Sequence, residues 1–188
     1  MRTLIDTSSL VRMAQSYYPF DSTESLESFL QKEMEGGSII ILDKVFEEIH
    51  FVSQGIVDNR FKCLRNNNLI RSTKNLVPTK KFYNMLDNNF VDRAMKNMKF
   101  REDENGYQNQ RLSYLQGADC NMIVYAMNEN NELDPIQILT EESANQNDGK
   151  LFKKIPLICK ELKIPTVNVV EYFKQHRDDL IVEVKSAK

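Results

Sequence analysis

Short apolar segments alternate with helical segments along this chain, and that alternation limits the fold more than any other feature of the sequence. Strands are predicted at four segments: Thr3–Ile5, Ser38–Leu42, Ile136–Leu139 and Pro165–Val170. These segments are apolar on both faces, which a sheet covered by helices on both sides requires. Strands that alternate with helices predict an α/β fold with a mainly parallel central sheet.

Helices are predicted between the strands from the spacing of apolar residues. They span Leu10–Ser16, Ser25–Glu35, Lys44–Val52, Phe82–Phe100, Gly117–Asn128, Pro156–Leu162 and Glu171–His176. The segment Glu102–Gln110 is predicted to be a polar loop. A length of 188 residues fits one domain, 1–188, with a helical, basic insertion around residues 60–110.

Composition argues against several classes of protein. The longest unbroken apolar run, Met122–Met127, is too short to span a bilayer, so no membrane association is expected. Residues 1–5 lack the long apolar stretch of a signal peptide. Three scattered cysteines and two distant histidines argue against a zinc site and favour a reduced, cytoplasmic location. Any metal chemistry would therefore use carboxylates.

The charged residues are unevenly distributed, although the formal net charge is only −2. The segment Arg60–Arg101 contains eleven Lys or Arg residues and two acids, with aromatic residues interleaved. Such a basic surface can attract nucleic-acid phosphates, and the candidate nucleic-acid-binding residues, for RNA in particular if the chain is a ribonuclease, are Lys62, Arg65, Lys80 and Lys81. Two other interpretations remain open: a solvated helical insertion whose aromatic residues are core, and a face that docks an acidic segment of a partner protein.

Acidic residues stand at positions where an α/β protein forms its binding site. Asp6 follows the first strand, at the sheet edge where ligands bind, although it could instead cap the next helix. On the helix predicted at Lys44–Val52, Glu48 lies on the flank of the apolar face and Glu47 points toward solvent. Glu48 is therefore the candidate site residue, and Glu47 is a surface charge.

Two more acidic positions extend this pattern. Asp119 shares one face of its predicted helix with three apolar residues, where an unpaired charge is costly to bury. It either caps the start of the helix or lines a cleft with a cation. Glu141 and Glu142 follow the strand Ile136–Leu139, and a solvated loop is the usual explanation for such a pair.

Taken together, these acids indicate a metal site. Clustered carboxylates repel one another unless a cation neutralises them. Oxygen ligands without His or Cys suit Mg²⁺ or Mn²⁺. One or two such ions can activate water and stabilise an in-line phosphoryl transition state.

Several short blocks of the chain resemble the PIN domain family and, within it, the PIN-like bacterial group DUF4411. The blocks are Leu4–Leu10, Val45–Ile49, Ala118-Asp119 with its apolar helix, Ile138–Glu142, and Lys154–Cys159 followed by Ile164–Val170. Each block is short, and their order and spacing carry the resemblance.

The resemblance implies a three-layer α/β/α sandwich and a divalent-metal-dependent endoribonuclease, often the toxin of a toxin–antitoxin pair. It implies that Asp6, Glu48 and Asp119 are the principal catalytic and metal-binding acids. The fourth acid falls on Glu142, for which Glu141 could substitute, and Ser8 matches an auxiliary hydroxyl near the metal. RNA is the expected substrate, with Mg²⁺ or Mn²⁺ as cofactor. An antitoxin protein and a second copy of the chain, forming a homodimer, are candidate partners.

Two other functions are weighed against the ribonuclease. A catalytically inactive PIN-like module that binds RNA or protein is the main alternative, and the presence of all four acids favours the enzyme. A HAD-type phosphotransferase would need an acid two residues after Asp6, where this chain has Ser8. No Gly-rich phosphate-binding loop of the GxxxxGK[ST] type occurs in the sequence.

Overall fold

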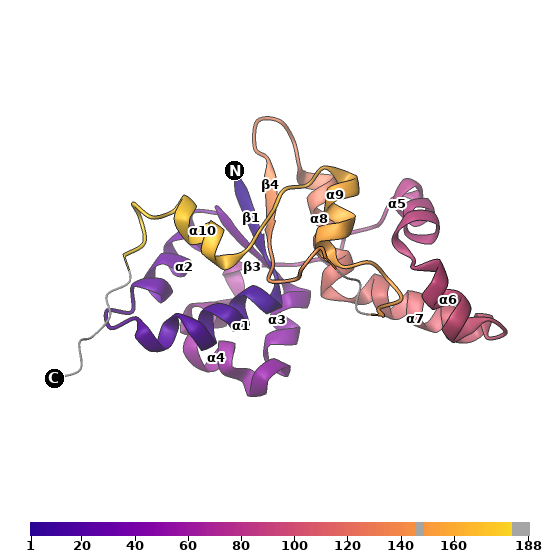
Figure 1. Ribbon diagram of the computed structural model, residues 1–188. Helices are drawn as coiled ribbons and strands as arrows, with labels where there is room; N and C mark the ends of the chain where they lie inside the picture. The colour runs from indigo at the N-terminus through magenta and orange to yellow at the C-terminus, as the bar shows by residue number, and fades with distance from the viewer. Residues whose placement is uncertain (146–148, 182–188) are drawn as a thin grey trace.

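Five parallel strands form the sheet at the centre of the protein (Figure 1). In the computed structural model, which describes residues 1–145 and 149–181, their order is β3-β2-β1-β4-β5. The strands are β1 (Arg2–Ile5), β2 (Ile39–Leu42), β3 (Ile70–Arg71), β4 (Ile136–Leu139) and β5 (Thr166–Val167). The predicted α/β class with a mainly parallel sheet is confirmed.

The central strand β1 is paired on both sides. Leu4 lies level with Ile40 of β2 and with Ile138 of β4. Side chains of these strands are buried on both faces, and burial of apolar surface contributes about 25 cal/mol per Å². The ladder continues beyond β1, because the backbone N–H of Asp6 donates to the carbonyl of Leu139 at 2.9 Å. The end of β1 is therefore held against the end of β4.

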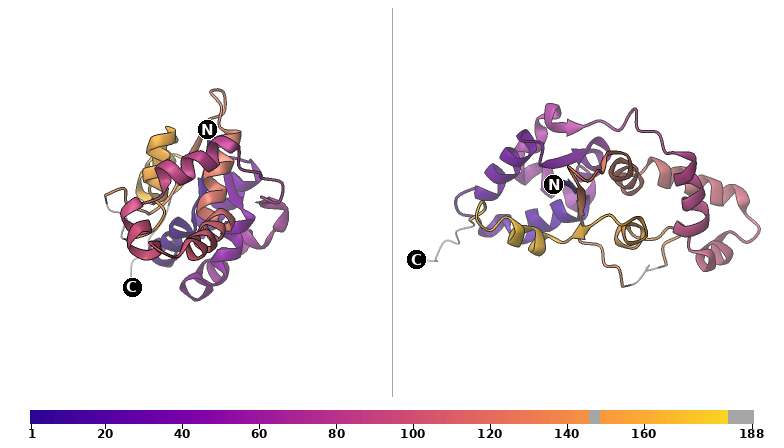
Figure 2. Two further views of the ribbon diagram at one scale, coloured as in Figure 1. Left: turned by 90° about the vertical axis from the view of Figure 1, so that its right-hand side faces the viewer. Right: turned by 90° about the horizontal axis from the view of Figure 1, so that it is seen from above.

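Helices cover both faces of the sheet and complete the predicted three-layer α/β/α sandwich (Figure 2). One layer contains α1 (Thr7–Ser16), α2 (Ser25–Glu35), α4 (Ile56–Arg60) and α10 (Val169–Gln175). The other contains α8 (Ala118–Glu129) and α9 (Ile155–Leu162), which pack against each other. A further helix, α3 (Asp43–Ile49), starts directly after β2 and contacts both α1 and α8. It therefore links the two layers at the edge where the strands end.

Three helices between β3 and β4 form what we call the helical lobe, at the opposite end of the protein from α2 (Figure 1). They are α5 (Lys80–Met85), α6 (Arg93–Phe100) and α7 (Glu104–Gln116), with a π-helical turn at Leu86–Phe90. Phe82, Leu86 and Phe90 are buried inside it. A bridge between Val91 and Phe152 ties the lobe to the segment before α9. The lobe is thus attached to the sandwich by this bridge as well as by the chain connections at its two ends.

The structure corrects three sequence-based expectations. The polar loop predicted at Glu102–Gln110 is wrong, because α7 begins at Glu104 and is capped by Asp103, whose carboxylate accepts from the N–H of Gly106 at 2.8 Å. The continuous helix predicted at Phe82–Phe100 is interrupted by the π-helical turn. Strand β3 was not predicted, and it places Ile70 and Arg71 in the sheet.

The edge strand β3 is held by a carboxylate on α3. Asp43 accepts hydrogen bonds from the backbone N–H of Thr73 at 2.9 Å, from its hydroxyl at 2.6 Å and from the Ser72 hydroxyl at 3.1 Å. Burial raises the pKa of Asp43, but these hydrogen bonds outweigh it and hold the pKa below its ordinary value. Asp43 is therefore a structural acid that stabilises the fold in its charged form.

Two further observations bear on the expected class of protein. All three cysteines, Cys63, Cys120 and Cys159, are free and buried. Across residues 1–145 and 149–181, none of the helices combines the length and apolar character needed to cross a bilayer.

Candidate functional site

The predicted acids come from four elements that meet at the carboxyl edge of the sheet. Asp6 follows β1, and Glu142 lies three residues after β4. Glu48 is in the last turns of α3, which follows β2, and Asp119 is in the first turn of α8. The four carboxylates influence one another electrostatically, since Asp6, Glu142 and Glu48 each raise the pKa of Asp119. The structure therefore brings Asp6, Glu48, Asp119 and Glu142 into one neighbourhood.

Asp6 occupies the N-cap position of α1, but its side chain makes no capping hydrogen bond. One carboxylate oxygen, Oδ2, accepts from the hydroxyl of Ser8 at 2.5 Å and from the hydroxyl of Thr140 at 2.9 Å. Within the described part of the chain, no group donates to the other oxygen, Oδ1. The capping interpretation is wrong, and the two hydroxyls orient a buried carboxylate instead.

The charge of Asp6 is disfavoured where it stands. Burial raises the pKa of Asp6, hydrogen bonds from Ser8 and Thr140 oppose the shift, and Glu142 and Glu48 add to it. A cation at this position would reverse the balance, because it would stabilise the ionised carboxylate.

The two glutamates of α3 differ as predicted. Glu47 is exposed and forms an ion pair with Lys44 at 2.8 Å. Glu48 is half-buried, and its Oε2 accepts from the hydroxyl of Thr7 at 2.7 Å. Because Thr7 neighbours Asp6, this bond fixes Glu48 beside the end of β1.

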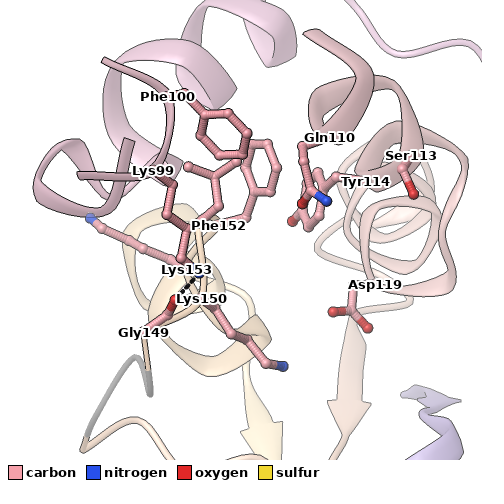
Figure 3. Close-up of a pocket in the computed structure, with 11 residues that line it drawn as sticks. Lys99, Phe100, Gln110, Ser113, Tyr114, Asp119, Gly149, Lys150, Phe152 and Lys153 are labelled. Carbon is pink, nitrogen blue, oxygen red and sulfur yellow. Dashed lines mark hydrogen bonds between the residues drawn. The ribbon is translucent and has the colours of Figure 1, made fainter. Parts of the chain in front are cut away.

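Asp119 lines a cavity and does not cap its helix. The N-cap of α8 is Gly117, and among the described residues no hydrogen-bond donor reaches the Asp119 carboxylate. Burial, followed by repulsion from Asp6 and Glu142, raises its pKa to about 7, although Lys150 opposes the shift. Of the two roles open to Asp119 from the sequence, the structure supports the one at a cleft (Figure 3).

Glu142 is engaged by two groups of the protein. Its Oε1 accepts from the ammonium of Lys150 at 2.6 Å, and its Oε2 accepts from the N–H of Ile155, the first residue of α9, at 2.9 Å. Glu142 therefore stabilises the start of α9 as well as facing the other acids.

Glu141 is directed elsewhere. Its Oε1 accepts from the N–H of Val169 at the start of α10 at 2.8 Å, and its Oε2 lies 3.9 Å from the guanidinium of Arg12. Its backbone N–H donates to the hydroxyl of Ser8 at 3.1 Å. Of the two candidates for the fourth acid, Glu142 is the one that acts electrostatically on Asp6 and Asp119.

The fit of these acids to a divalent cation is incomplete in this arrangement. The donor set is all oxygen, and Asp119 has no competing donor among the described residues, which suits Mg²⁺ or Mn²⁺. Yet over residues 1–145 and 149–181 no group of three or more His, Cys, Asp or Glu side chains is placed to hold an ion. The carboxylates repel one another, and Glu142 is held by Lys150, so the acids would have to draw together around an ion.

The four candidate RNA-binding residues are exposed but do not share one surface. Lys62 and Arg65 lie on a short helical turn that packs against α2 and α4, and Arg65 is paired with Asp58 at 3.6 Å. Lys80 and Lys81 open α5 in the helical lobe, at the other end of the molecule (Figure 1). The single basic face expected from the charge distribution is thus divided between two regions.

Sequence reasoning missed two residues of the site. Thr140 directly follows β4, and a hydroxyl at a strand end beside the acids was a usable signal. Lys150 had no such signal, because it lies eleven residues after the end of β4 and comes back to Glu142 through the tertiary fold.

Comparison with known proteins identifies one family. The family model described as a domain of unknown function, DUF4411, matches residues 3–180, a range that includes every strand residue except Arg2 and every acid described above. No curated protein and no solved structure matches the chain.

Proposed function

The chain belongs to the DUF4411 family, whose description assigns no activity, and from its site we propose that it is a divalent-metal-dependent endoribonuclease. The observation that carries this proposal is the meeting of four carboxylates at the carboxyl edge of a parallel sheet, with the pKa of Asp6 and of Asp119 raised. Acids that repel one another without a neutralising cation are typical of sites that bind metal and phosphate.

Each side chain has a distinct part in this proposal. Asp6, Glu48 and Asp119 hold the ion, with Ser8 and Thr140 orienting Asp6 and Thr7 orienting Glu48. When bound, Mg²⁺ or Mn²⁺ supplies charge stabilisation at the phosphate and lowers the pKa of a coordinated water. Glu142 lies at the rim of the site, where Lys150 and the start of α9 keep it in position.

The finer assignments are also proposals. The resemblance of the sequence blocks to PIN domains supports a PIN-like nuclease that acts as the toxin of a toxin–antitoxin pair in the cytoplasm, with an antitoxin and a homodimer as its assemblies. The alternative, a non-catalytic PIN-like module that binds RNA or protein, is favoured by one observation. In the described part of the chain, no three acids are placed to hold an ion.

Variants of two neighbouring glutamates distinguish the ribonuclease from the non-catalytic binding module. We expect the wild-type chain to cleave single-stranded RNA with Mg²⁺ or Mn²⁺ and not with EDTA. Glu48→Gln should lower the cleavage rate at least about tenfold, because it removes one of the three carboxylates proposed to hold the ion. Glu47→Gln, one residue away and exposed, should leave the rate unchanged. Equal rates for both variants, or no metal-dependent cleavage by the wild type, would favour the binding module.

The divided basic residues allow a second test. RNA affinity falls as salt rises, and the slope of log K against log salt concentration measures the number of phosphate contacts. Replacing both Lys80 and Lys81 by Ala should make this slope less steep by about 0.7 for each phosphate contact that is lost. Replacing both Lys62 and Arg65 should change it less, because Arg65 is paired with Asp58 and both lie on the opposite side of the protein from the lobe. Salt titrations of RNA affinity measure both slopes, and two unchanged slopes would leave the basic segment as a solvated surface.

A further inference from the structure

A cavity of about 510 Å³ opens beside Asp119, between the helical lobe and the segment that precedes α9 (Figure 3). Phe100 of α6 and Gln110 and Tyr114 of α7 lie on its walls. Lys150 extends toward it from the other chain segment, on the side of Asp119. Its volume is within the range of about 300–1,000 Å³ that is usual for small-ligand pockets. The cavity therefore has room for one nucleotide next to Asp119.

Aromatic rings supply the apolar walls of this cavity. Tyr114 and Phe152 stack on each other with centroids 4.2 Å apart and an interplanar angle of 18°. Phe100 is half-buried and contacts Tyr107 edge-on, with its centroid 6.3 Å away. The facing surfaces of Tyr114 and Phe152 already cover each other, so this pair backs the wall. The ring of Phe100 can accept the flat face of a nucleobase, which stacks on it whatever its sequence.

One buried polar group in this wall lacks a partner. The hydroxyl oxygen of Tyr114 is inaccessible to solvent, and no group in the described parts of the chain forms a hydrogen bond with it. Leaving such a group unpaired is costly, so native proteins rarely do it without a reason. Because this oxygen is closed off from solvent, a base in the cavity does not reach it in this conformation, and Gln110 is the polar group of the wall that a base edge can meet. On the same helix, Gln110 offers an amide with both donor and acceptor atoms.

Lysine ammonium groups lie near the cavity, but two of them are already paired. Lys150 is paired with Glu142 and Lys153 with Glu161, each at 2.6 Å. The Lys99 ammonium donates at 3.1 Å to the uncharged carbonyl of Gly149, so its position is fixed and its charge can meet a phosphate. An ammonium group placed in this way attracts phosphate without reading sequence.

We propose that this cavity holds one unpaired nucleotide of single-stranded RNA, its base against Phe100 and its phosphate directed to the acids at Asp119. The assignment of the neighbouring phosphate to the acids rests on the proposed function, whereas the base site does not. An unpaired base is required because a duplex already stacks both faces of each base and pairs its edge. The cavity thus makes the site selective for single strands.

Binding measured in EDTA tests the base site separately from cleavage. Fluorescence anisotropy would follow a labelled RNA hexamer, the same hexamer with abasic nucleotides, and its duplex, each titrated with the full chain. The intact single strand should bind at least about tenfold tighter than the other two, as one stacked base provides. Free UMP should bind much more weakly than the hexamer, since it lacks the neighbouring phosphates.

Variants identify the cavity as the place of binding. Phe100→Leu keeps apolar volume but removes the flat ring, and it should weaken hexamer binding about fivefold or more while leaving the abasic hexamer unaffected. Gln110→Ala should change the preference among the four bases. Met98→Ala and Gln108→Ala, on the same two helices but outside the cavity, are the matched controls and should bind as the wild type does.

The proposal is overturned if the abasic or duplex RNA binds as tightly as the single strand, if UMP matches the hexamer, or if Phe100→Leu binds normally. Thermal melting of Phe100→Leu checks its folding, and Gln110→Ala on the exposed face of α7 provides a second variant that leaves the core intact. Tight, base-dependent binding in EDTA without cleavage in Mg²⁺ would retain the base site and reject the nuclease.

Discussion

Asp6→Asn is expected to reduce metal-dependent RNA cleavage by at least about 100-fold, while the metal-free variant is as stable as the wild type or more stable. The loss of activity follows from removing a charge that holds an ion, since the ion contributes several kcal/mol to the transition state. The gain in stability follows from the raised pKa of Asp6, because burial and two neighbouring acids disfavour its charge at pH 7. The amide oxygen can still accept from Ser8 and Thr140.

A structural aspartate provides the matched control. Asp21 accepts from the N–H of Leu26 at 2.7 Å and from the Ser25 hydroxyl at 2.9 Å, and although burial raises its pKa, these bonds hold it below the ordinary value. Asp21→Asn should therefore lose stability and keep cleavage, the reverse of Asp6→Asn. Thermal melting in EDTA and a cleavage assay in Mg²⁺ measure both effects. A loss of stability in Asp6→Asn as large as in Asp21→Asn would mean that Asp6 is mainly structural.

The free energy of unfolding of the metal-free protein should fall between about pH 4 and pH 7 because of Asp119. Its pKa is about 7 in the folded protein and 3.8 when unperturbed, so over this interval the unfolded state loses its proton first. A difference of about three pKa units lowers the free energy of unfolding by up to about 4 kcal/mol over this interval. Asp119→Asn, which cannot ionise, should match the wild type near pH 4. At pH 8 it should melt about 10 °C higher.

Added Mg²⁺ should oppose this loss of stability at higher pH. An ion that binds the ionised Asp119 competes with its proton, so Mg²⁺ should raise the melting temperature of the wild type more at pH 8 than at pH 5.5. Asp119→Asn should show little of this protection. Melting curves recorded in EDTA and in Mg²⁺ at both pH values measure it. Parallel pH profiles for the two proteins would show that the Asp119 charge is not buried among the other acids.

The elements with strong periodicity were predictable, and those held by tertiary contacts were not. The helix predicted at Ser25–Glu35 has those bounds, because its apolar residues repeat at helical spacing and Gly36 ends it. By contrast, α7 has a weak apolar periodicity and buries only Tyr107 fully. Its cap, the packing of Tyr114 and Leu115 against the core, and the ion pair of Arg111 with Asp87 at 2.7 Å hold it in place. Strand β3 has two residues, which is too short for any alternation to be visible.

The candidate site shows the same contrast between residues that periodicity places and residues that tertiary contacts place. Helical periodicity distinguished Glu48 from Glu47 and placed Asp119 on an inward face, and both placements are confirmed. Periodicity could not show that Glu142 is held by Lys150 and the start of α9, because those contacts depend on how distant segments return to the sheet. For the same reason, the basic segment looked continuous in the sequence although the fold separates its two ends.

The position of the helical lobe makes it easy to remodel. It lies within a crossover that leaves the sheet at Arg71 and returns at Ile136. The entropy cost of closing a chain excursion grows only with the logarithm of its length, about 0.6 kcal/mol for each doubling. Helices of the lobe can therefore be lengthened, shortened or exchanged at little cost, while the strands stay in register and Asp6 and Glu142 keep their places after β1 and β4. Changes in ligand preference during evolution would accumulate in the lobe, and the chemistry would be conserved at the strand ends.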